Sequence, residues 1–210
     1  CVCVCVCVCV SCPVLSCVPS LMGLFNVVPF YAAYGSYHHN TTNKTIHIVG
    51  VPAIVWSFLL FFTLAPPLPV EPISPLPALS LTWGAPLVLI LIALYTAMDV
   101  AVGLFATVLL GVSYCGANLY LDVFGATSTL HMAVGIQVVG WGTQFLGHAV
   151  FEKRRPALFD NLLQVFIAPF FVMLEILFLF GYKKEVQEEC EKVILSNIQK
   201  MDAAAERKNK

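Results

Sequence analysis

The side chains best suited to chemistry in this sequence are its histidines, three of which lie close together. His38, His39 and His47 stand on either side of the run 40–43, Asn-Thr-Thr-Asn, whose residue types favour turns and helix N-caps. Imidazole nitrogens without thiolate partners are typical ligands of iron, zinc or copper. A metal site in this stretch is therefore the first hypothesis.

Two more histidines, His131 and His148, lie in the second half of the chain, and Glu152 follows His148 by four residues. On a helix, that spacing places imidazole and carboxylate on one face, where they bind one metal or form a ligand and its hydrogen-bonding partner. If residues 129–150 formed one straight helix, 17 residue steps would separate the two histidines by about 25 Å. Either the helix breaks near residues 140–142, Gly-Trp-Gly, or one histidine belongs elsewhere.

The composition is that of a membrane protein. Hydrophobic residues make up 59% of the 210 positions and charged residues 11%, and the mean hydropathy is +0.86. Because ionisable groups are costly inside a bilayer, histidines there are functional-site hypotheses by default. The alternative is a structural role, in which each ring binds only a backbone carbonyl. The net charge of −1 argues against nucleic acid as a partner.

Three segments differ in composition. Residues 1–20 hold seven of the nine cysteines, and the strict Cys-Val alternation of residues 1–10 matches a translated TG repeat. We interpret them as a low-complexity Cys/Val-rich segment, disordered or artefactual. Residues 21–182 carry the apolar stretches and are expected to form the membrane domain. Residues 183–210 combine thirteen charges with helix formers, which predicts a charged, soluble C-terminal helix outside the membrane.

The first long apolar stretch predicts a helix that carries His47. Asn43 is placed to cap this helix, which runs from Lys44 to Ala65 and is stopped by the Pro-Pro pair that follows. Residues 46–65 are long enough to span a bilayer core of about 30 Å. Pro52 lies inside the run and is expected to break or kink the helix one turn after His47.

The later apolar stretches predict further membrane helices. Residues 83–98 and 100–121 are separated only by Asp99 and predict a tight transmembrane hairpin, while residues 130–150 continue apolar and rich in glycine. A last apolar run covers residues 161–180. The predicted fold class is therefore all-α: a polytopic membrane helical bundle with about four to five apolar segments.

Basic residues set the expected topology, because those beside membrane spans prefer the cytoplasm. If Lys44 is cytoplasmic and four spans follow, the Lys-Arg-Arg cluster at 153–155 returns to the same side. The lysines at 183–184 prefer that side too, which makes residues 161–180 a re-entrant segment that bends at Pro169. A fifth full span is the alternative.

Two ordered motifs resemble the Mpo1-like family over about residues 24–182. The first is Tyr37-His38-x4-Asn43-x2-Ile46-His47-x2-Gly50-x-Pro52; the second is Gln144-Phe145-x-Gly147-His148-x3-Glu152-x3-Pro156-Ala157-Leu158, joined to Ala168-Pro169-x5-Glu175. The resemblance implies a multi-pass protein of the endoplasmic reticulum membrane that acts as an iron(II)-dependent dioxygenase. The implied reaction takes a 2-hydroxy fatty acid and O2 to a fatty acid one carbon shorter and CO2, in phytosphingosine breakdown, with the acyl tail held among membrane lipid.

Carried over residue by residue, the resemblance implies four Fe²⁺ ligands: His38, His47, His131 and His148. His39 matches no fixed histidine of the family and is expected to be only a neighbour. Asn43 and Glu152 fall inside the motifs and are implied to be site residues that orient the ligands. The basic cluster at 153–155 attracts the substrate carboxylate or is simply the positive flank of a span.

Two other classes of membrane protein also carry functional histidines. Di-iron fatty acid desaturases and hydroxylases hold their metals with more histidines than the five present here. A non-enzymatic carrier or scaffold would use the histidines and Glu175 as proton-relay or packing groups. Metal content separates this alternative from the dioxygenase, because a carrier has no need of bound iron.

Overall fold

The computed structural model describes residues 26–66, 68–69, 75–153, 156 and 164–208, and the regular elements in those ranges are all helices. In chain order they are α1 (Val27–Tyr37), α2 (Thr41–Thr63), the 3₁₀ turn η1 (Pro77–Leu79), α3 (Gly84–Met98), α4 (Val100–Gly147), the π turn η2 (His148–Glu152), α5 (Gln164–Leu179) and α6 (Lys184–Lys208). The all-α class is therefore confirmed. The segment 1–20, and Arg154 and Arg155 of the basic cluster, lie outside the described residues.

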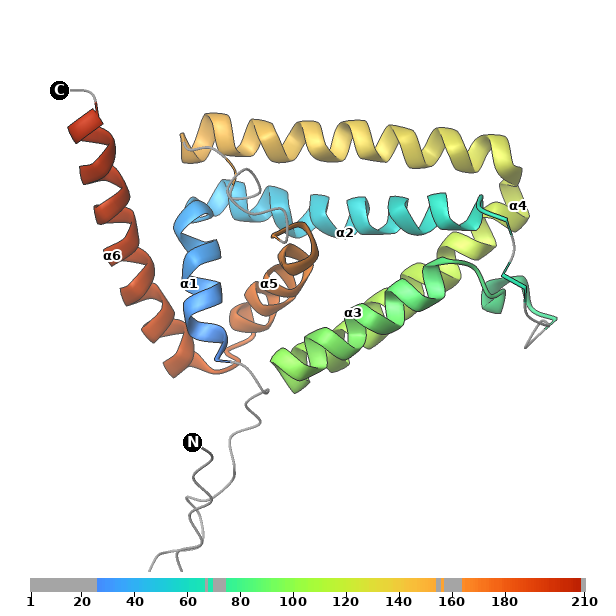
Figure 1. Ribbon diagram of the computed structural model, residues 1–210, viewed down its shortest axis with the longest axis horizontal. Coiled ribbons are helices and arrows are strands. Elements are labelled where there is room, and N and C mark those ends of the chain that lie inside the picture. The colour runs from blue at the N-terminus through green and yellow to red at the C-terminus, as the bar shows by residue number, and fades with distance from the viewer. Residues whose placement is uncertain (1–25, 67, 70–74, 154–155, 157–163, 209–210) are drawn as a thin grey trace, which may run out of the picture.

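Helix α2 begins at Thr41 because Asn40 caps it. The Asn40 Oδ1 atom accepts hydrogen bonds from the backbone N–H groups of Thr42 (2.9 Å) and Asn43 (3.3 Å). The prediction that Asn43 caps this helix is therefore wrong, because Asn43 already lies in the first turn and its own N–H is one of those that need a partner. The helix then continues through Pro52 to Thr63 without the predicted break (Figure 1).

Helices α3 and α4 form the predicted hairpin around Asp99. This residue is extended (φ −157°, ψ 123°), and its Oδ1 atom accepts hydrogen bonds from the backbone N–H groups of Ala101 and Val102, which caps α4. Gly103 allows the two helices to approach closely, because a Cβ atom there would overlap the backbone of Thr96. Figure 1 shows α3 lying along the first arm of α4.

Helix α4 bends once, at Gly125, whose φ of 74° and ψ of 170° are accessible at low cost only to glycine. Its second arm then runs back alongside α2 (Figure 1). The expected segments 100–121 and 130–150 are thus two arms of one bent helix. The second arm is helical through residues 140–142, so the break considered there does not occur.

Helix α6 packs against α1 and is not detached from the rest of the molecule. Cys190 and Ile194 of α6 are each 1% exposed, and Ile194 lies against Gly35 of α1. The predicted C-terminal helix is therefore present, but it is docked on the helical domain rather than separate from it. Figure 1 shows it beside α1, on the outer edge of the molecule.

An ion pair joins the α5–α6 turn to the α3–α4 turn. Lys183 Nζ lies 2.6 Å from Asp99 Oδ2, and the Tyr182 hydroxyl donates to the same carboxylate (3.0 Å to Oδ1). Helix α5 contains Pro169 and does not reverse direction there, so the re-entrant bend expected at this proline is absent from the described part of the chain. These contacts hold α5 against the hairpin and, through it, against α2.

Two of the described helices are long and apolar enough to cross a membrane, namely α2 and α4 with its π turn. Helices α3 and α5 are apolar but shorter. One face of α4 exposes Leu104, Val108 and Val112 at one-turn spacing, each about two-thirds exposed. The predicted apolar segments are thus present as helices, of which two reach spanning length.

Candidate metal centre

Three buried histidines meet where α1 ends, α2 begins and α4 ends. His38 follows α1, His47 lies in the second turn of α2, and His148 opens the π turn η2. Each is at most 5% exposed, and one ring nitrogen from each lies within 4.8 Å of the others. The ring centroids are 4.5, 4.6 and 5.0 Å apart, with steeply inclined planes. Three imidazole nitrogens are therefore within reach of one ion.

Backbone carbonyls orient two of these rings. His38 Nδ1 lies 2.9 Å from the carbonyl oxygen of Tyr34, and His47 Nδ1 lies 2.9 Å from that of Asn43, in each case four residues earlier. Because a carbonyl only accepts, both Nδ1 atoms carry the proton and both Nε2 atoms keep a lone pair. Metal-binding histidines are commonly held in this way through their second nitrogen. The Tyr34 ring also stacks on His38, with centroids 3.9 Å apart.

His148 is held differently. Its Nδ1 atom is buried and has no hydrogen-bond partner among the described residues. Its backbone N–H reaches the carbonyls of both Gln144 and Phe145, where the helix widens into a π turn, a form frequent at functional sites. A buried nitrogen without a partner is costly unless an ion or ligand engages the ring. The residues present therefore fit a metal ion: two rings are already oriented and the third has an unsatisfied nitrogen.

Burial favours the neutral form of His38. Removal from water, and next the neighbouring rings of His47 and His148, lower the pKa of His38 well below its ordinary value. A neutral imidazole keeps the lone pair that a metal needs, and such donors suit iron, zinc or copper. No carboxylate belongs to this group within the described ranges. A divalent ion there would keep its full positive charge and attract an anionic ligand such as a carboxylate.

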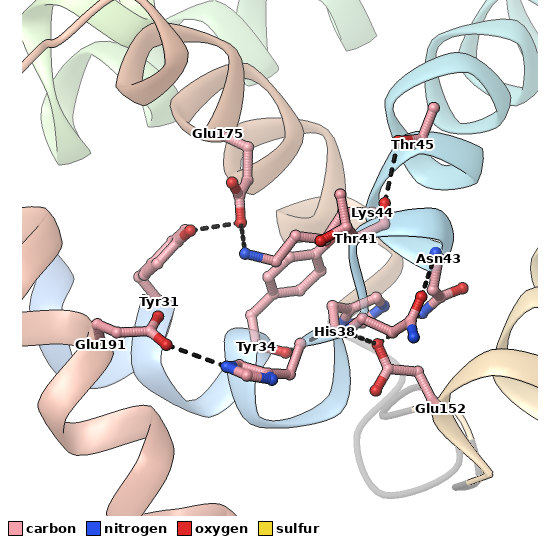
Figure 2. A network of polar contacts seen from close by, with 12 residues as sticks. Tyr31, Tyr34, His38, Thr41, Asn43, Lys44, Thr45, Glu152, Glu175 and Glu191 are labelled. Carbon is pink, nitrogen blue, oxygen red and sulfur yellow. Dashed lines mark hydrogen bonds and ion pairs between the residues drawn. The ribbon is translucent and has the colours of Figure 1, made fainter.

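Glu152 and Asn43 brace the start of α2 beside the cluster. The Glu152 Oε1 atom accepts hydrogen bonds from the backbone N–H of Asn40 (2.8 Å) and from Asn43 Nδ2 (3.2 Å), as Figure 2 shows for the labelled pair. The positive end of the helix dipole also favours a carboxylate at this position. Glu152 thus holds the side chain of Asn43, and the backbone carbonyl of Asn43 in turn orients His47. Both residues are placed to position a ligand rather than to be one.

The structure does not bring His131 to the other three histidines. It is exposed on the second arm of α4 and lines a separate groove between α2 and α4. The uninterrupted helix separates it from His148 by about 25 Å along the axis. Of the two alternatives above, the structure shows the one in which a histidine lies elsewhere. His39 also points away, with its Nε2 atom 3.0 Å from Glu191 of α6.

A second polar group lies next to the histidine cluster. Glu175 of α5 accepts a hydrogen bond from the Tyr31 hydroxyl (2.5 Å) and lies 2.8 Å from Lys44 Nζ (Figure 2). Glu175 is only 8% exposed, so these partners satisfy a largely buried side chain. The contacts tie α5 to α1 and α2, which carry the first two histidines of the cluster.

An apolar cavity of about 330 Å³ opens from the three histidines. One wall is a single face of α2, on which His47, Val51, Ile54, Phe58 and Phe62 follow each other at helical spacing. Helices α3 and α5 and the end of α4 supply the other walls. From His47 to Phe62 the wall is about 22 Å long, at ~1.5 Å per residue. The cavity therefore has a nitrogen-lined end and a long apolar body.

Two cavity residues were not predicted from the sequence. Tyr34 and Gln144 line the cavity beside the histidines, and each lies four residues before one of them. On a helix this spacing places both members of each pair on one face. This four-residue interval was the signal present in the sequence, because Asn43 also precedes His47 by four residues.

Known proteins that are similar to this chain share one family description. Residues 24–179, which contain all three clustered histidines, match the family described as 2-hydroxy-palmitic acid dioxygenase Mpo1-like. The chain is 35% identical over 170 residues to the 2-hydroxy-palmitic acid dioxygenase MPO1 of Saccharomyces cerevisiae, and the alignment covers 80% of this chain and 90% of the yeast protein. No solved structure matches the chain. From the extent of the family match and this identity, the chain belongs to the Mpo1-like family.

Proposed function

We propose that this protein is an iron(II)-dependent dioxygenase that shortens 2-hydroxy fatty acids by one carbon. The observation that carries the proposal is the cluster of His38, His47 and His148 at one end of a long apolar cavity. The name of the yeast relative supplies the substrate class and the type of reaction. In balanced form, the 2-hydroxy acid and O2 give the fatty acid one carbon shorter, CO2 and water.

The cavity supports a substrate with one polar end and a long hydrocarbon tail. Its α2 wall, about 22 Å long, is comparable to an extended long acyl chain. Beyond His47 that wall is formed only by aliphatic and aromatic side chains. An acid that entered tail first would bury its chain along α2 and bring its carboxyl and 2-hydroxyl groups to the histidines. This orientation places the bond to be cleaved at the nitrogen-lined end.

Iron(II) would be held by His38, His47 and His148, and when bound it would supply oxygen activation and positions for the polar groups of the substrate. The chain's own residues prepare this site. The carbonyls of Tyr34 and Asn43 hold two imidazoles in the tautomer that presents Nε2. Asn43 is in turn held by Glu152, so both act as positioning residues. The apolar walls exclude water from the reacting carbons.

The membrane assignment is part of the same proposal. Helix α2 and each of the two arms of α4, before and after the bend at Gly125, are long enough to cross a bilayer core of about 30 Å. We propose a multi-pass protein of the endoplasmic reticulum membrane, in which the acyl tail stays among lipid and the spans. An enzyme placed there takes up an apolar substrate without transferring it through water.

The test is turnover of 2-hydroxypalmitate by purified protein in detergent, with iron(II) and then with a chelator. The fifteen-carbon acid should form only with iron. His38→Ala should lose both bound iron and product, while the adjacent His39→Ala, which changes a ring outside the cluster, should keep both. Folded protein that binds no iron and forms no product would refute the proposal and favour a carrier or scaffold.

A further inference from the structure

One polar atom of the cavity wall is left without a partner. Among the described residues, three buried side-chain atoms lack a hydrogen bond: Asn43 Oδ1, Gln144 Oε1 and His148 Nδ1. Asn43 does not line the cavity, and His148 belongs to the metal cluster. Gln144 lines the cavity and is 4% exposed, so its carbonyl oxygen is an acceptor enclosed beside the histidines.

Two other polar side chains of the wall, those of Tyr95 and Trp141, have partners. The Tyr95 hydroxyl donates to the carbonyl of Phe166 (2.6 Å), and Trp141 Nε1 donates to Gln137 Oε1 (2.7 Å). A buried acceptor left without a donor is energetically unfavourable. An oxygen of this kind in an otherwise apolar cavity indicates a ligand that brings its own donor.

The surroundings fix which end of the Gln144 amide is free. Its Nε2 atom donates to the carbonyl oxygen of Ile46 (3.3 Å), which offers no hydrogen. Rotating the amide would set two acceptors against each other, so the oxygen must be the end without a partner. Gly50 makes this position available, because a Cβ atom there would overlap Gln144 Nε2.

We infer that Gln144 Oε1 accepts a hydrogen bond from the 2-hydroxyl group of the substrate and so selects 2-hydroxy acids over unsubstituted fatty acids. The inference rests on the proposed function for its substrate class. An ionised carboxylate cannot donate to this oxygen, whereas a hydroxyl can. Gln144 precedes His148 by one helical turn on the same face, which places its oxygen at the end of the cavity where the polar groups of the acid arrive.

Selectivity follows from the cost of leaving the oxygen unpaired. An unsubstituted acid fills the same apolar cavity but provides no donor at the second carbon. A site built to bind a hydroxyl rejects an analogue that lacks it, because the buried group then stays unsatisfied. Replacing Gln144 by methionine keeps the length of the side chain and removes the oxygen, so both acids should then bind alike.

The test is equilibrium binding to the metal-free full-length protein in detergent, with labelled 2-hydroxypalmitate displaced by unlabelled 2-hydroxypalmitate or palmitate. Wild-type protein should prefer the hydroxy acid by about tenfold, the factor that ~1.4 kcal/mol represents. Gln144→Met should reduce this ratio to near one by weakening the hydroxy acid while sparing palmitate. General damage to the fold would weaken both acids together and leave the ratio unchanged.

Two further variants keep the test sharp. Gln137→Met removes an amide on the same helix that bonds Ser57 and Trp141 and does not line the cavity, so its ratio should equal that of wild type. Gly50→Ala displaces the Gln144 amide from the opposite helix and should lower the ratio even if Gln144→Met fails to fold. A wild-type ratio near one, or an unchanged ratio in Gln144→Met or Gly50→Ala, would overturn the inference. If the iron-loaded wild type shows no turnover but still binds the hydroxy acid in preference to palmitate, only the proposed reaction is refuted.

Discussion

Gly147 is the position where one added methyl group should disturb the metal centre without changing any ligand. A Cβ atom there would overlap Asn43 Oδ1 and lie 3.4 Å from Ile46 Cδ1. Asn43 is fully buried and bonded to Glu152, and its carbonyl orients His47. Gly147→Ala must therefore displace the side chain that links α2 to the end of α4.

The expected magnitude follows from the contacts that would be lost. The hydrogen bond from Asn43 Nδ2 to a carboxylate contributes about 1.5–3 kcal/mol. Overpacking adds about 1–3 kcal/mol, and the better helix propensity of alanine offsets about 1 kcal/mol. The net destabilisation should be about 1.5–5 kcal/mol. Because the altered residues hold a ligand from outside, metal affinity should fall by about 10–100-fold.

The assay is competition for iron(II) with a chelator of known affinity, beside thermal unfolding in the same detergent. Gly142→Ala is the matched control, because it makes the same substitution on the same helix with no atom within 4 Å of the new methyl group. The control should keep wild-type iron affinity and gain up to about 1 kcal/mol of stability. Equal iron affinity in the two variants would refute the idea that Asn43 transmits the disturbance to His47.

Three further predictions concern the ligand set, the helix junctions and the repeat. His47→Ala should abolish iron binding and turnover while His131→Ala retains both; loss of iron in His131→Ala would return that residue to the ligand set. Asp99→Ala removes the cap of α4 and the ion pair with Lys183, so unfolding free energy should fall by about 2–5 kcal/mol, whereas an unchanged denaturation midpoint would contradict that role. Deletion of residues 1–20 should leave turnover intact, and a loss at equal expression would show that the repeat contributes.

Local patterns in the sequence carried the prediction of the helices and of part of the site. The apolar runs around Asp99 predicted a hairpin, because a single charge between two uncharged stretches marks a turn. The polar run at 40–43 correctly predicted a helix start, although the cap is Asn40 rather than Asn43. Several residues in that run can cap a helix, and only the position of the oxygen decides among them.

Long-range packing was beyond such patterns. The helical spacing between His131 and His148 showed that both cannot bind one ion on a straight helix, but only the fold shows which of them meets His38 and His47. The docking of α6 on α1 depends on Ile194 meeting Gly35, two residues with no relation in sequence. Gln144 is conspicuous only once its oxygen is seen to lack a partner.

The packing of α6 against α1 also has a consequence for how the protein is made. Synthesis proceeds from the N-terminus, so His38 and His47 emerge from the ribosome long before the helix that covers α1. Before α6 is synthesised, the surface of α1 around Gly35 lacks the cover that Ile194 provides in the folded protein. His148 lies in η2, far along the chain from the other two histidines, so the cluster can assemble only after η2 has been synthesised, and under the proposed function iron would bind after that step.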